Sequence, residues 1–216
     1  MKILYSGMYG SRCHPFNVLA DKCEVAGKPS DMVEEDSALV IWGGADINPS
    51  YYNHPQSRTT YPSSVRDPVE WALIHRAIAM GIPIIGVCRG AQMLCAAAGG
   101  FLIQDVGGHA GSNHYVTAYD GTKFLVNSIH HQMLGIPDQV DHELIGWSTA
   151  NLSKEYIWKD DKKYEPPTGF KEPEMVVFPS IKGFAIQWHP EGMSSNSEAT
   201  QFILKEYHAR FSTSKV

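Results

Sequence analysis

The 216-residue sequence has no hydrophobic run long enough to cross a membrane, because a spanning helix needs about 20 consecutive apolar residues. At the amino terminus only Ile3, Leu4 and Tyr5 are apolar before Ser6, far fewer than a secretory signal requires. We therefore expect a cytoplasmic protein that neither enters a membrane nor is secreted.

Cysteine is scarce, with four residues at Cys13, Cys23, Cys88 and Cys95. None of them forms the C-x-x-C pair typical of metal sites, and a chain of this length does not need disulfides to be stable. We therefore expect no metal, no cofactor and free thiols that are available for chemistry.

Basic residues are also few, since 18 lysines and arginines face 23 acidic residues, for a net charge of -5. Without a cationic surface, nucleic acid is not an expected partner, and a small substrate fits better. The length suits a single domain over residues 1–216, and the 43% hydrophobic content suits a folded core.

Short apolar runs at Lys2–Tyr5, Ala38–Trp42 and Ile82–Val87 are typical of buried parallel strands. Between the last two, residues 67–80 have helical spacing, with Asp67 and Glu70 as an expected capping box. This alternation of strands and helices predicts an α/β fold.

Further along, Phe101–Ser148 predicts short strands and loops, and the charged Lys154–Pro173 stretch predicts an irregular surface loop. Val176–Phe178 and Gly183–His189 read as a hairpin, followed by a closing amphipathic helix over Ser197–Arg210.

The segment Gly86-Val87-Cys88-Arg89-Gly90 has the G-x-nucleophile-x-G form of a sharp strand-to-helix turn. Its glycines let strand and helix approach closely, and the helix amino terminus favours a thiolate at Cys88. A lone cysteine is more often a small buried residue, which is our expectation for Cys95. Cys88 is the candidate nucleophile.

A thiol needs a base, and His189 is the best placed of the ten histidines because it ends the apolar stretch Gly183–Trp188. Glu191 lies two residues further on. Side chains two apart on an extended backbone point the same way, so Glu191 is expected to orient the His189 ring.

Four motifs together resemble the class I glutamine amidotransferase-like superfamily, closest to its γ-glutamyl hydrolase branch, peptidase C26, which includes the γ-glutamyl-γ-aminobutyrate hydrolases. They are Gly43-Gly44-Ala45-Asp46-Ile47-Asn48-Pro49, Pro83-Ile84-Ile85-Gly86-Val87-Cys88-Arg89-Gly90-Ala91-Gln92, Asn127-Ser128-Ile129-His130-His131-Gln132 and Gln187-Trp188-His189-Pro190-Glu191. The resemblance implies a three-layer, flavodoxin-like α/β sandwich with a mostly parallel sheet and a nucleophile elbow.

It also implies cleavage of a γ-glutamyl amide through a γ-glutamyl thioester, with Cys88, His189 and Glu191 as the triad. Backbone N–H groups of Gly44 and Arg89 match the oxyanion positions, and a further set matches positions that hold the glutamyl group: Gln92, Ser128, His130, His131 and Gln132. About forty residues before Gly43 and the charged Lys154–Pro173 stretch depart from the branch, which leaves the amine half of the substrate open.

Three alternatives remain. The first is a glutaminase subunit that passes ammonia to a separate synthase partner, which ranks behind a free-standing hydrolase. A dienelactone-type cysteine hydrolase shares G-x-C-x-G, but there a long stretch separates the acid from the histidine that follows it, whereas Glu191 follows His189 by two residues. A non-catalytic binding relative would keep the fold without the chemistry.

Overall fold

The computed structural model describes residues 2–6, 14–33, 36–62, 65–111 and 113–211. Within them a nine-stranded sheet has the order β2-β1-β3-β4-β14-β13-β10-β7-β8. The first five strands in this order pair in parallel and the remaining pairings are antiparallel. The bounds are β1 (Lys2–Ser6), β2 (Lys22–Ala26), β3 (Asp36–Ile41), β4 (Ile84–Val87), β7 (His114–Ala118), β8 (Lys123–Val126), β10 (Glu143–Ser148), β13 (Pro173–Phe178) and β14 (Gly183–Ile186).

The strands predicted from apolar runs are confirmed, because every residue of β4 and β14 is buried, as parallel strands covered on both faces require. The predicted hairpin is formed by β13 and β14. The edge strand β2 was not predicted, since Lys22 and Glu24 are exposed and the strand has no hydrophobic run.

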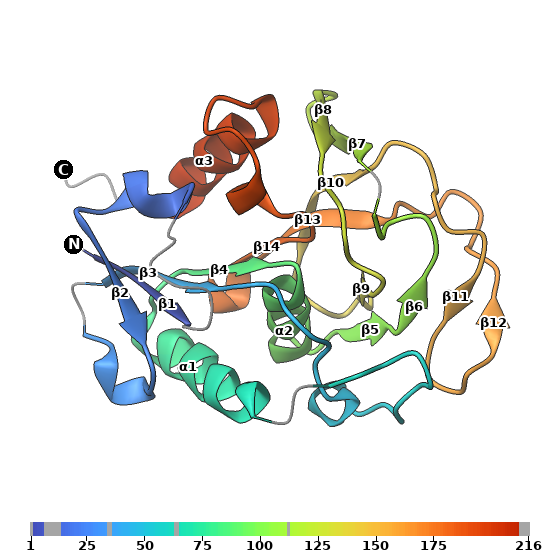
Figure 1. Cartoon of the computed structure of the whole chain (residues 1–216), viewed down its shortest axis with the longest axis horizontal. Coiled ribbons are helices and arrows are strands. Elements are labelled where there is room, and N and C mark those ends of the chain that lie inside the picture. Colours follow the sequence, from blue (N-terminus) through green and yellow to red (C-terminus); the bar gives the residue numbers. More distant parts are fainter. Residues whose placement is uncertain (1, 7–13, 34–35, 63–64, 112, 212–216) are drawn as a thin grey trace.

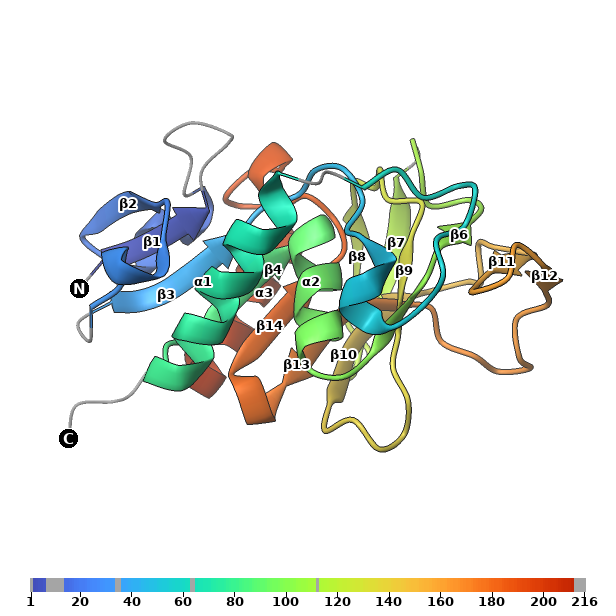
Figure 2. The ribbon, with the colours of Figure 1, turned by 90° about the horizontal axis from the view of Figure 1, so that it is seen from below.

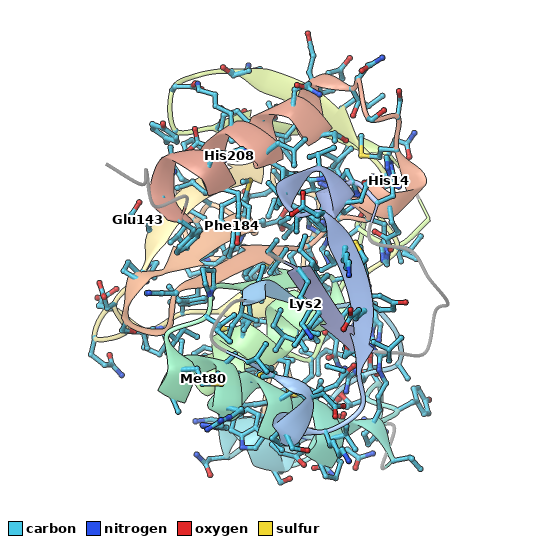
Figure 3. The ribbon with its side chains drawn as sticks, turned by 90° about the vertical axis from the view of Figure 1, so that its left-hand side faces the viewer. Lys2, His14, Met80, Glu143, Phe184 and His208 are labelled. Carbon is cyan, nitrogen blue, oxygen red and sulfur yellow. The ribbon has the colours of Figure 1, made fainter. Side chains whose placement is uncertain are left out.

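Helices cover both faces of the sheet. Figures 1 and 2 show α1 (Arg66–Met80) and α2 (Arg89–Ala97) on one face and α3 (Glu198–Phe211) on the other. Figure 3 shows the sheet between α1, which ends at Met80, and α3, with Phe184 beneath α3. The Phe184 ring lies 5.8 Å from that of Tyr207. This is the expected three-layer α/β sandwich.

The chain makes 3-10 turns at η1 (Phe16–Leu19), η2 (Pro29–Asp31), η3 (Pro49–Tyr52), η4 (Pro179–Ile181) and η5 (Pro190–Gly192). No helix in the described ranges has the length and apolarity to span a membrane. The expectation of a single domain stays a prediction.

The stretch Lys154–Pro173 is more ordered than predicted. Strands β11 (Tyr156–Ile157) and β12 (Lys163–Tyr164) form a small sheet with β6 (Asp105–Val106), away from α1 in Figures 1 and 2. The Trp158 ring stacks on Phe101 at 4.8 Å, in strand β5 (Phe101–Ile103), which pairs with β9 (Met133–Gly135). The prediction of an irregular loop was wrong because these aromatic side chains anchor the segment.

Candidate active site

Cys88 lies between β4 and α2 on a strained turn. Its φ of 51° and ψ of -109° fall in a region that non-glycine residues rarely adopt. A Cβ on Gly86 would lie 2.5 Å from the Gly90 carbonyl oxygen, and one on Gly90 would collide with the Ile41 carbonyl. The two glycines therefore allow the close strand-to-helix crossing that the sequence predicted.

His189 and Glu191 are paired. The His189 Nδ1 atom lies 2.6 Å from Glu191 Oε1. β14 ends at Ile186, and Glu191 belongs to the 3-10 turn η5. The expected contact is present, but a tight turn makes it, and the extended backbone assumed from the sequence is absent because Pro190 begins that turn.

Asn127 holds the His189 backbone in place. Its Oδ1 accepts a hydrogen bond from the His189 N–H at 3.0 Å, and its Nδ2 donates to the His189 carbonyl at 2.9 Å. Sequence reasoning assigned Asn127 no role, although it begins the third motif of the resemblance.

Cys88 and His189 meet at Gly43. A Cβ on Gly43 would lie 2.6 Å from His189 Cε1 and 3.4 Å from Cys88 Cβ, so only glycine leaves room between them. Burial opposes a charge on His189, but hydrogen bonding to Cys88 and Glu191 outweighs it and raises the pKa of His189 to about 10. A pKa in this range favours the protonated ring beside the Cys88 sulfur at neutral pH.

We expect the Cε1 NMR signal of His189 to titrate with a midpoint near pH 10, and Glu191→Gln to lower the midpoint by removing the stabilising carboxylate. The raised pKa means that His189 stabilises the fold fully below about pH 6.5, a contribution lost as the pH rises through 10. A midpoint near pH 6.5 in both proteins would contradict the pairing.

Arg66 orients the loop that follows β3. Its Nη1 donates to the Gly43 carbonyl at 2.8 Å, and its Nη2 donates to the Trp42 carbonyl at 2.9 Å. In a trans peptide the N–H points opposite to the C=O, so the Gly44 N–H points away from Arg66. A Cβ on Gly44, where φ is 153°, would collide with the Arg66 guanidinium.

The Arg89 side chain lies fully buried between Asp67 and Glu70 of α1 and pairs with both carboxylates. Helix α1 begins at Arg66 without a side-chain cap, so the predicted capping box of Asp67 and Glu70 was wrong. The two acids instead compensate the buried Arg89 charge, and Glu70 also accepts from Arg66 Nε at 2.8 Å. As the first residue of α2, Arg89 has an N–H without an intrahelical acceptor.

Three of the predicted glutamyl-binding residues come together at the Gln132 carbonyl. Gln92 Nε2 donates to it at 3.1 Å, and His130 Nδ1 lies 3.0 Å from it. Gln187 Nε2 also donates to it at 2.9 Å, although sequence reasoning gave Gln187 no role. The side-chain Oε1 atoms of Gln132 and Gln187 are buried without a hydrogen-bond partner.

The other two predicted residues have separate contacts. Ser128 Oγ donates to the His109 carbonyl. His131 lies between Asp46, at 2.9 Å, and Asp105, at 3.3 Å, and the Asp46 hydrogen bond raises its pKa against the effect of burial. Among the described residues, the side chains with metal-ligand geometry are His109, His130 and Glu174.

The Peptidase C26 family model matches residues 19–121. Similar proteins include Rv2859c of Mycobacterium tuberculosis, a candidate glutamine amidotransferase that is 45% identical over 34% of this chain and 25% of its own length. NtpR of Enterococcus hirae is 26% identical over 82% of this chain and 78% of its own. The carbamoyl phosphate synthase small chain of Xanthomonas campestris is 36% identical over 30% of this chain and 18% of its own length.

For Rv2859c and the synthase chain, the match thus spans a quarter or less of the relative's length. Among solved structures, PurLQS of Thermotoga maritima has a TM-score of 0.63 at 14% identity, covering 96% of this chain and 97% of that one, which supports the fold. Together with the four motifs and the geometry around Cys88, the family-model match and the curated relatives support assignment of the chain to the class I glutamine amidotransferase-like superfamily.

Proposed function

We propose that the chain hydrolyses γ-glutamyl amide bonds, with Cys88 as nucleophile, His189 as acid and base, and Glu191 as the residue that orients His189. The observation that carries the proposal is the meeting of the strained Cys88 turn with the His189–Glu191 pair at Gly43. Nucleophile, base and orienting acid in contact are the requirement for covalent catalysis.

In the proposed reaction the Cys88 thiolate attacks the γ-carbonyl carbon, and the oxyanion forms towards the N–H groups of Gly44 and Arg89. The His189 imidazolium then gives its proton to the leaving amine, which departs and leaves a γ-glutamyl thioester. Neutral His189 next takes a proton from water, which attacks the thioester and releases glutamate. Asn127 and Glu191 hold the ring for both transfers.

The glutamyl group needs partners for an ammonium and a carboxylate. We propose that the side of the site that binds the glutamyl group is formed by Gln92, Ser128, His130, His131 and Gln132. The unpartnered acceptor on Gln132 suits the α-ammonium, because a buried acceptor without a donor costs free energy that a bound ligand recovers.

A second candidate function is a glutaminase that delivers ammonia to a synthase. The similarity to the carbamoyl phosphate synthase small chain favours it. A direct test compares the kcat/KM of the purified chain for glutamine and for γ-glutamyl amides of larger amines. Hydrolase function predicts preference for the larger amides, and preference for glutamine that rises with a synthase present would support the second function instead.

Gly43→Ala tests the geometry of the site without removing a reacting group. The new Cβ would lie 2.6 Å from His189 Cε1, so the ring must shift away from Cys88, and misplacement of this size lowers kcat by about 100-fold. The fold should remain, because the clash is with a side chain. Kinetics and circular dichroism check both statements, and unchanged kcat would contradict the proposed arrangement.

A further inference from the structure

A buried ionisable cluster lies outside the proposed triad. It contains His109, His114, His130, Glu172 and Glu174, all of which are at most 7% exposed. Three imidazole nitrogens approach the same oxygen, Glu174 Oε1: His114 Nε2 at 3.0 Å, His109 Nδ1 at 3.1 Å and His130 Nε2 at 3.4 Å. The residues come from β13, from the start of β7 and from the segments that follow β6 and precede β9.

At the centre of the cluster, the contacts of the His109 and His130 rings with Glu174 lack hydrogen-bond geometry. His109 Nδ1, His130 Nε2 and Glu174 Oε2 are all buried without a hydrogen bond of normal geometry. Buried polar atoms in folded proteins are nearly always partnered. Three such atoms around one point indicate a ligand that accepts lone pairs.

The outer nitrogens of the two histidines are anchored. His109 Nε2 lies 3.0 Å from Glu172 Oε2, and His130 Nδ1 lies 3.0 Å from the Gln132 carbonyl. A carboxylate or carbonyl behind the ring is the usual support of a metal-bound histidine, because it fixes the tautomer and the orientation.

The two possible tautomers of His130 also favour a bound cation. If Nδ1 donates to the Gln132 carbonyl, Nε2 turns a lone pair towards the Glu174 carboxylate, which is repulsive without a cation between them. In the other tautomer His130 Nδ1 has no hydrogen and accepts a hydrogen bond from Gln187 Nε2. Nδ1 then lies 3.0 Å from the Gln132 carbonyl oxygen, so that two acceptors face each other without a proton between them.

We propose that His109 Nδ1, His130 Nε2 and the Glu174 carboxylate bind one divalent transition-metal ion, with Zn²⁺ as the ion that this donor set suits best. The ligand atoms all lie within 4.8 Å of one another. Zn–N bonds of about 2.0 Å place tetrahedral ligands about 3.4 Å apart, and His109 Nδ1 and His130 Nε2 lie 3.1 Å and 3.4 Å from Glu174 Oε1. Glu174 Oε2 supplies a fourth donor.

The charges also fit. Two glutamates lie buried in the cluster, and a divalent ion neutralises both. Without metal, burial opposes a charge on His109, but the carboxylates of Glu172 and Glu174 outweigh it and raise its pKa to about 9. Without a metal ion, the alternative is one proton that gives His109 a positive charge. That state leaves one of the two buried glutamate charges uncompensated.

Such an ion would be structural, and His130 would then support the glutamyl-binding residues through the Gln132 carbonyl instead of contacting the substrate. The ion would tie β13 to the segment Asn127–Gln132, whose ends contact the His189 backbone and Gln92, without touching the reacting atoms. The cysteine pattern predicted no metal because C-x-x-C pairs are absent, whereas these ligands lie on three separate segments.

The test measures metal content by mass spectrometry after expression in zinc-supplemented medium and dialysis against a chelator. We expect about one zinc per wild-type chain, and less than about a fifth of that in Glu174→Gln and His130→Gln. The control His75→Gln changes an exposed histidine of α1 and should keep the full content.

A second measurement uses wild-type chain unfolded with chelator and refolded with Co²⁺, which should give the visible absorption of tetrahedral cobalt and a higher Tm than metal-free refolding. It needs no variant, so it decides even if the variants fail to fold. Wild-type chain that holds no metal and binds no Co²⁺, or equal zinc in wild type and Glu174→Gln, would overturn the proposal.

Discussion

Cys88→Ala is expected to lower the kcat for γ-glutamyl amides by a factor of about 1,000 or more, since the thioester route needs a nucleophile. The fold should remain, with at most the small loss of stability expected for deleting one buried sulfur atom. Steady-state kinetics and thermal unfolding measure the two effects.

Cys95→Ala is the matched control, in the same helix. Cys95 is fully buried, and burial raises the pKa of its thiol to about 12, so it carries no thiolate at neutral pH. This variant should lose some stability through a small cavity and keep its kcat. Equal activity of Cys88→Ala and wild type would end the case for a cysteine nucleophile.

Glu70→Ala is expected to destabilise the fold by about 3–5 kcal/mol, because removing one partner of a buried ion pair leaves a charge uncompensated. Glu70 is 2% exposed and contacts both Arg66 and Arg89. Since Arg66 in turn holds the Trp42 and Gly43 carbonyls, surviving protein should also have a lower kcat. Denaturant unfolding measures the first effect.

Glu198→Ala, which changes an exposed glutamate of α3, provides the comparison and should cost about 1 kcal/mol or less. If Glu70→Ala cost no more than Glu198→Ala, the network between α1 and the Cys88 turn would not stabilise the fold as described.

Patterns in neighbouring residues predicted the buried strands and the sharp turn that depend on local sequence. The buried runs of β4 and β14 and the glycines around Cys88 are recorded in neighbouring residues, and the structure contains them. The β2 strand was missed because Lys22 and Glu24 are polar and exposed, so the segment has no hydrophobic run. Its pairing with β1 depends on the sheet edge and not on its own composition.

Contacts between distant segments were beyond local reasoning. Glu70 looked like part of a helix cap, yet its partner Arg89 belongs to another helix. Asn127 was assigned no role, yet it hydrogen-bonds the His189 N–H and carbonyl from a separate segment. Such pairings depend on how elements pack, which one sequence does not reveal.

The central claim is that Cys88 becomes covalently bound to the glutamyl group. The most direct test incubates the wild-type chain with a diazoketone analogue of glutamine and maps the modified peptide by mass spectrometry. The account predicts one label per chain, on Cys88, that excess γ-glutamyl amide suppresses and that Cys88→Ala abolishes. A label on another residue, or no label on a chain that turns over γ-glutamyl amides, would contradict it.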